Sequence, residues 1–107
     1  MNHFFTYGTE NKNLEELTIE ISKLFNVQLK EHESSWWGIY VIGKTSSIKE
    51  IKIYPNFVEG EGYHEKNTNH EYLLTITDPK NHVQIPEIMK NSVSKFELII
   101  HNEYQNT

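Results

Sequence analysis

The feature that most constrains this chain is a stretch of aromatic and β-branched residues that runs from Trp36 to Phe57. Its first part, Trp36–Ile42, is almost wholly apolar, a composition typical of a strand buried on both faces. Gly43 and the polar residues Lys44–Ser47 follow, and they are typical of a turn. The stretch therefore predicts a hairpin whose first strand lies at the centre of a sheet.

The second strand of this hairpin alternates in polarity, which predicts one buried face and one face toward water. The two expected sets are Ile51, Ile53 and Phe57 inside, and Lys52, Tyr54 and Asn56 outside. Trp36 and Trp37 are adjacent, so on a strand their side chains point to opposite faces. We expect one indole under a helix and the other on the open face, where it either anchors a partner or covers the sheet.

The other elements follow from periodicity. Apolar residues at helical spacing, with Ile19 pointing away from them, predict a core-facing helix over Asn13–Phe25, and Asn13 with Glu16 resembles a capping box. His3–Tyr7 is either an edge strand or a segment folded over the core. Further strands are expected at Val27–His32, His70–Thr77 and Lys95–His101, the last in the sheet interior, with a short helix at Ile85–Lys90 and Val93 facing inward.

Together these elements predict one α+β domain over residues 1–107. Its single sheet has about five mainly antiparallel strands, with the N-terminal helix packed on one face and a short helix before the last strand. The order of the last helix and strand allows one parallel pair.

The charge balance narrows the class of partner. The chain carries 15 acidic and 10 basic residues, a formal net charge of −5, and every basic residue is lysine. Clustered lysine and arginine neutralise phosphates in nucleic-acid-binding proteins, so direct binding to nucleic acid is disfavoured. Residues 55–107 hold eight acidic and four basic residues, which places the acidity in the second half. A basic protein partner fits this composition.

An acidic loop is expected over Val58–Asn69, where apolar periodicity ends. One interpretation is a recognition loop in which glutamates meet basic groups of a partner and aromatic residues anchor it; the other is a solvated connection. The partner-binding candidates are Glu59, Glu61, Tyr63, Glu65 and Trp36.

No catalytic or cofactor constellation is recognisable. The absence of cysteine excludes disulfides and thiolate metal sites and fits a reducing cytoplasm, and no apolar stretch is long enough for a membrane span. The six histidines, among which His64 and His70 flank Glu65 and Glu71, lack the spacing of known metal motifs, so we predict no metal site. Glu31 and Glu33 share a strand face, which we interpret as solvated rather than as a catalytic carboxylate pair.

Three runs carry a family resemblance: Trp37–Gly43, Ile48–Phe57 and Glu71–Ile76. With the acidic loop between the last two, they resemble the small immunity proteins of bacterial contact-dependent growth inhibition and related polymorphic-toxin systems. The resemblance implies a cytoplasmic inhibitor, without catalysis of its own, that binds and blocks the C-terminal domain of a cognate toxin, often a nuclease. These families share no catalytic residues, so none is carried over.

A physical argument leads to the same expectation. A nuclease presents positive charge to its substrate, and a small acidic protein can occupy that surface with fast, steered association. Tight inhibition then needs a few buried aromatic anchors as well as the carboxylates. The alternative is a cytoplasmic protein-binding or regulatory module of another kind, including one that dimerises through a strand edge.

Overall fold

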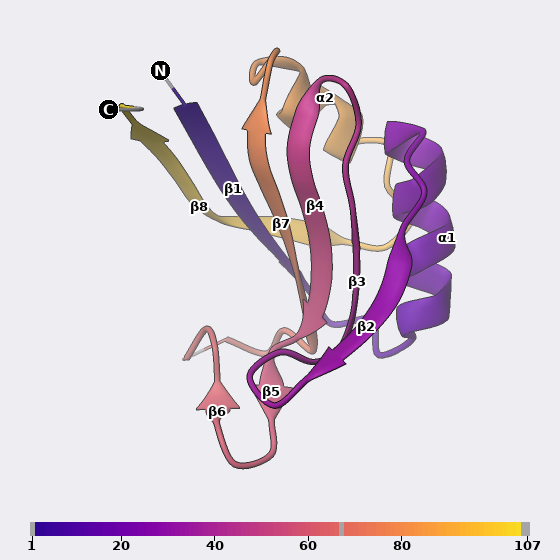
Figure 1. The fold of residues 1–107 in the computed structure, drawn as a ribbon, viewed down its shortest axis with the longest axis vertical. Helices are drawn as coiled ribbons and strands as arrows, with labels where there is room; N and C mark the ends of the chain where they lie inside the picture. Colours follow the sequence, from indigo (N-terminus) through magenta and orange to yellow (C-terminus); the bar gives the residue numbers. More distant parts are fainter. Residues whose placement is uncertain (1, 67, 106–107) are drawn as a thin grey trace.

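The computed structural model describes residues 2–66 and 68–105. A six-stranded sheet runs in the order β2-β3-β4-β7-β1-β8 with antiparallel neighbours, and a small β5–β6 hairpin extends from one end (Figure 1). The chain is thus α+β with an antiparallel sheet. Its elements are β1 (Asn2–Thr9), α1 (Leu14–Phe25), β2 (Lys30–Ser34), β3 (Gly38–Gly43), β4 (Ile48–Pro55), β5 (Phe57–Val58), β6 (Gly62–Tyr63), β7 (Tyr72–Pro79), α2 (Gln84–Met89) and β8 (Phe96–Tyr104).

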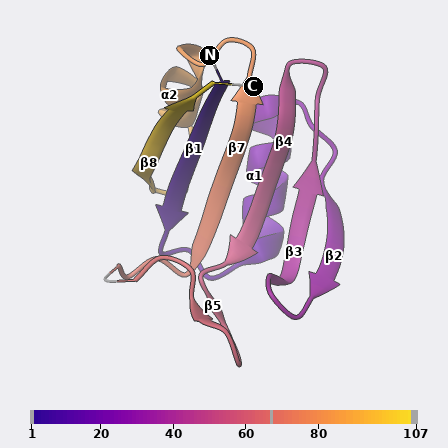
Figure 2. The same ribbon diagram turned by 60° about the vertical axis from the view of Figure 1, so that its left-hand side comes forward.

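Helix α1 lies across one face of the sheet (Figure 2) and begins where its sequence predicts. The Asn13 side chain accepts a hydrogen bond from the Glu16 amide at 3.1 Å, which caps the first turn. Leu17 and Ile21 are fully buried, whereas Ile19 is exposed, as expected. Helix α2 adds two residues to the same core, whose buried members are Phe5, Tyr7, Leu17, Ile21, Phe25, Val27, Val41, Ile48, Ile51, Ile53, Leu74, Ile76, Ile85 and Met89.

The position of strand β1 differs from the prediction and changes both the number and the order of the strands. Residues His3–Tyr7 belong to an interior strand, which pairs with β7 on one side and with β8 on the other. The sheet therefore has six strands instead of five. Helix α2 carries the chain past β1, so β7 and β8 run in the same direction without being neighbours. The parallel pair that the sequence allows does not form, because β1 lies between β7 and β8.

Two apolar strands lie nearer the sheet margin than predicted. Strand β3 is next to the edge strand β2 instead of central, and Ile39 is 47% exposed. Strand β8 is itself an edge strand and extends beyond His101 to Tyr104, with Leu98 exposed. Val93 is also exposed, not buried. The β-branched and apolar composition of β3 and β8 indicates that each is a strand, but it does not show how many neighbouring strands each one has.

The turn between β2 and β3 contains both tryptophans, which the sequence predicts on a strand. The Ser34 hydroxyl accepts a hydrogen bond from the Trp37 amide at 2.9 Å, which favours a turn at this point. The opposite-face argument for Trp36 and Trp37 is therefore wrong. Strand β2 begins at Lys30 and not at Val27, because the Val27 amide still donates to the Ser22 carbonyl at the end of α1, at 3.0 Å.

Among the described residues, neither helix combines the length and the apolar character of a membrane-crossing segment.

Truncation of the buried face of α1 should destabilise the fold. We expect Leu17→Ala or Ile21→Ala to lower the free energy of unfolding by about 2–5 kcal/mol, because each leaves a cavity between helix and sheet. Ile19→Ala on the exposed face of the same helix is the matched control, with a change of about 0.5 kcal/mol or less. Chemical denaturation measures all three, and an equal loss at Ile19 would contradict this packing.

Candidate partner-binding surface

The β5–β6 hairpin is held against the sheet by Asn56, which follows β4. The alternating pattern predicts Asn56 on the solvent side, but it is fully buried. Its Nδ2 donates to the carbonyls of Glu65 (3.1 Å) and His70 (3.0 Å), and its Oδ1 accepts from the Glu65 amide at 2.8 Å. Its backbone amide donates to the Glu71 carbonyl at 2.9 Å, and its carbonyl accepts from the His64 amide at 2.8 Å. The acidic loop is thus organised around one buried polar residue.

Two aromatic side chains stand on the exposed face of the hairpin. Phe57 is paired across the strands with Tyr63, with ring centroids 4.9 Å apart, and the two residues are 53% and 54% exposed. Phe57 is predicted in the core, but the chain leaves the β4 ladder at Asn56 and turns Phe57 outward. A hollow of about 530 Å³ lies beside the pair, and its remaining lining is polar: Glu10, Lys12, Thr68, Asn69, His70 and Glu71.

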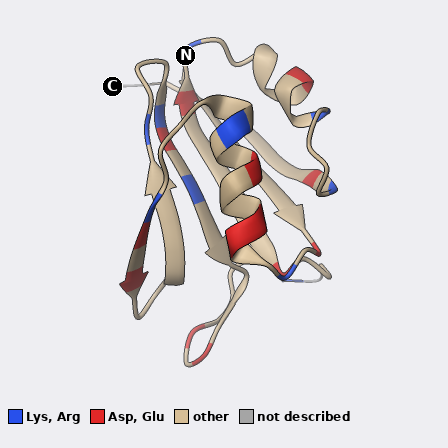
Figure 3. Cartoon of the chain, turned by 90° about the vertical axis from the view of Figure 1, so that its right-hand side faces the viewer, with Lys and Arg blue, Asp and Glu red and all other residues tan. Residues whose placement is uncertain are grey.

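Negative charge gathers at the same end of the molecule. Glu59 and Glu61 are exposed in the β5–β6 turn. Gly60, between them, and Gly62 both have a φ of 90°, a conformation that favours glycine and permits the tight tip. Figure 3 shows further acidic positions toward this end, in the first turn of α1 and along β2. They are Glu15, Glu16, Glu31 and Glu33.

Trp36 is supported by a cluster of aromatic rings. It is 51% exposed, and its ring lies edge-on to that of Trp37 at 6.2 Å. The His64 ring lies 5.2 Å from the Trp36 ring and 5.1 Å from the Trp37 ring, so it connects the β2–β3 turn to the hairpin. Tyr54 and Lys52 complete the cluster, with the Lys52 ammonium 3.7 Å from the Trp37 ring centroid.

Glu65 differs from the other candidate residues. It is half-buried, and its backbone is fixed by Asn56. Burial, with a smaller contribution from the Glu65 carboxylate, raises the pKa of Tyr54 to about 12. We use the name hairpin surface for the exposed residues at this end: Trp36, Phe57, Glu59, Glu61 and Tyr63.

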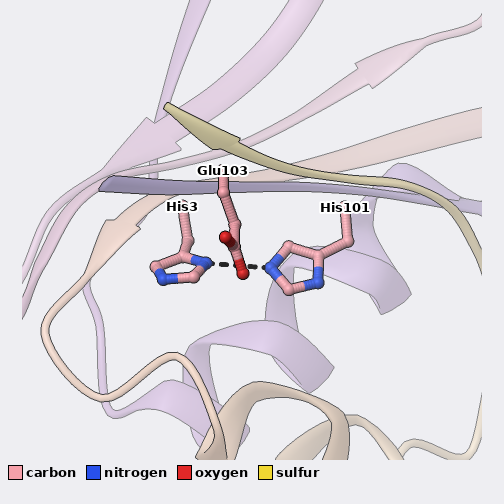
Figure 4. Close-up of side chains that lie close together, drawn as sticks. All are labelled: His3, His101 and Glu103. Carbon is pink, nitrogen blue, oxygen red and sulfur yellow. Dashed lines mark hydrogen bonds between the residues drawn. The ribbon is translucent and has the colours of Figure 1, made fainter. Parts of the chain in front are cut away.

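The histidines that flank Glu65 and Glu71 in the sequence do not meet. His64 lies in the aromatic cluster, whereas the His70 Nε2 atom lies 3.7 Å from a Glu97 carboxylate oxygen. A different group gathers where β1 meets β8: His3, His101 and Glu103 (Figure 4). The only sequence signal for this group is the alternation of His101 and Glu103, in a segment predicted to be mostly tail.

A scan against protein-family models gives no match, and searches of curated proteins and of solved structures give no significant similarity.

Loss of the Asn56 side chain should destabilise the protein and loosen the hairpin. We expect Asn56→Ala to lower the free energy of unfolding by about 3 kcal/mol, because it leaves an amide and two carbonyls without this partner. The control is Asn69→Ala at an exposed position of the same loop, with a change of about 0.5 kcal/mol or less. Chemical denaturation gives the stabilities, and similar losses for both variants would rule out a special role of Asn56.

The Tyr54 phenol should affect stability at alkaline pH. Its pKa of about 12 in the folded protein lies above the ordinary value of 10.0, so the folded state favours the neutral phenol. This contribution is fully present below pH 10 and is lost as the pH rises toward 12. We expect unfolding experiments across this range to show a steeper loss of stability for the wild type than for Tyr54→Phe. Parallel curves would contradict the burial of this hydroxyl.

Proposed function

We propose that this chain is an immunity-type inhibitor: it binds a basic toxin domain of the nuclease type in the cytoplasm and blocks it without turnover of its own. The single observation that carries the proposal is the hairpin surface, where three half-exposed aromatic side chains lie at the same end of the sheet as two carboxylates. The resemblance of the central strands to immunity proteins and the acidic net charge support the same function.

The aromatic residues supply the contact area that such a complex needs. Trp36, Phe57 and Tyr63 each leave about half of their surface in water, and aromatic residues are enriched in the energetically dominant centres of protein interfaces. Trp36 packs on the His64 and Trp37 rings, and Phe57 packs on Tyr63. Since neighbouring rings hold these side chains, little rotamer freedom is lost on association.

The carboxylates supply the expected attraction to a basic partner. Glu59 and Glu61 project at the hairpin tip, and the acidic positions of α1 and β2 extend the negative field behind them. Charges at an interface rim act mainly on the association rate and weaken with salt. The hairpin surface therefore favours a basic protein over a nucleic acid.

A binding and protection assay with the toxin domain encoded next to this gene tests the proposal. We expect reversal of Glu59, Glu61 and Glu65 to lysine to slow association and to weaken its salt dependence. Tyr63→Ala should instead speed dissociation, with a loss of about 2 kcal/mol in affinity. Glu65→Lys alone should have the smallest effect on association, because this residue is half-buried.

The control is Glu87→Lys, an exposed charge reversal on α2, where the association rate should not change. Unchanged affinity and salt dependence after the triple reversal would remove the acidic loop from the mechanism. Failure to bind or neutralise the neighbouring toxin domain would refute the immunity function. A dimer in light scattering of the free protein would instead favour the alternative of a module that self-associates along the edge strand β8.

A further inference from the structure

Strands β1 and β8 bring two imidazoles and a carboxylate to one point on the sheet. His3 is directly opposite Glu103 in the ladder, and Phe5 is opposite His101. Because alternate residues of a strand share a face, all three polar side chains lie on the same side. The His3 Nδ1 and His101 Nε2 atoms are 3.0 Å apart, and one potential ligand atom from each of the three residues falls within 4.8 Å of the other two (Figure 4).

Stacked neighbours fix the orientation of both rings. The His82 ring stacks on His3 with centroids 3.6 Å apart and an interplanar angle of 11°. Phe5 stacks on His101 at 4.1 Å and 12°. His3 is buried, whereas His101 and Glu103 are exposed. The cluster is therefore fixed at His3 and accessible to solvent at the other two residues. The rings are therefore held in place before any ligand arrives.

The geometry points to a binding site for a divalent transition-metal ion of the zinc type, with His3 Nδ1, His101 Nε2 and a Glu103 carboxylate oxygen as ligands. Two nitrogens bound to one tetrahedral zinc ion at about 2.0–2.1 Å lie about 3.3 Å apart, close to the separation of the two imidazole nitrogens here. Without metal, one ring can donate its N–H to the other across the same gap. Two imidazoles with one carboxylate suit zinc, cobalt or nickel, whereas magnesium and calcium prefer sites of oxygen alone.

The position of the cluster also bears on what the site can hold. His101 and Glu103 are exposed, so water or a substrate group can complete a three-residue set. The site lies near the N-terminal end of β1, away from the β5–β6 hairpin (Figure 1). It is thus independent of the proposed inhibitor function.

Titration of the full chain, without any histidine tag, with Co²⁺ tests this inference, because a d–d absorption spectrum reports nitrogen and oxygen coordination. We expect saturation at one ion per chain, displacement by Zn²⁺ and no displacement by Ca²⁺ or Mg²⁺ at equal concentration. Zn²⁺ should also raise the thermal unfolding temperature, since it binds only the folded arrangement.

Single substitutions of the exposed ligands should strongly weaken metal binding without unfolding the protein. His101→Ala and Glu103→Gln should each weaken Zn²⁺ binding by about 100-fold or more, since loss of even an outer-shell partner costs about 10–100-fold. His32→Ala is the matched control, an exposed histidine on the opposite edge strand β2, and it should bind as the wild type does. Circular dichroism without metal confirms that each variant is folded.

Three results would overturn the site: Co²⁺ binding that shows no saturation at one equivalent, equal Zn²⁺ affinity in the His101→Ala/Glu103→Gln double variant and the wild type, or the same loss in His32→Ala as in His101→Ala. Binding of a neighbouring toxin domain leaves these measurements unaffected, so the two proposals succeed or fail separately.

Discussion

Strand β1 pairs along both of its edges, with β7 on one side and β8 on the other, and the remaining architecture depends on this double pairing. Strand β8 joins the sheet through β1, and Phe5 and Tyr7 of β1 belong to the core beneath the helices. The contact between His3 and His101 spans 98 positions in the sequence. Such closure loses chain entropy before its hydrogen bonds form, so we expect the sheet to be completed late in folding.

The features that sequence reasoning predicts well are the local ones. The cap at Asn13 and the apolar stripe of α1 depend on residues within a few positions of one another, and the helix lies where both indicate. Strand order depends on pairing between distant segments, and the apolar run of β3 contains no information about its neighbours. Ile39 is exposed on a strand next to the sheet edge, although the strand has the composition of a buried one.

The candidate surface shows the same division. The loop composition indicates an acidic segment, and Glu59, Glu61, Tyr63 and Trp36 are exposed at one end of the sheet. It does not show that Val58 is buried, that Glu65 is half-buried, or that part of the segment forms a hairpin. The exposure of Phe57 is not predicted, because the alternating pattern of β4 continues in the sequence beyond Pro55 although the strand ends there. Buried Asn56 and the His3–His101–Glu103 group are missed too, since their role is set by partners that only the folded chain supplies.

The hydrogen bonds of Asn56 also bear on how recognition can change. They run mainly to backbone atoms on either side of the hairpin, so the frame of the loop depends little on the side chains at its tip. Substitutions at Glu59 or Glu61 alter the charge presented to a partner while the frame persists. Under the proposed function, a loop built in this way separates the residues that maintain its shape from those that would select a partner. Specificity can then diverge at the tip without loss of the fold.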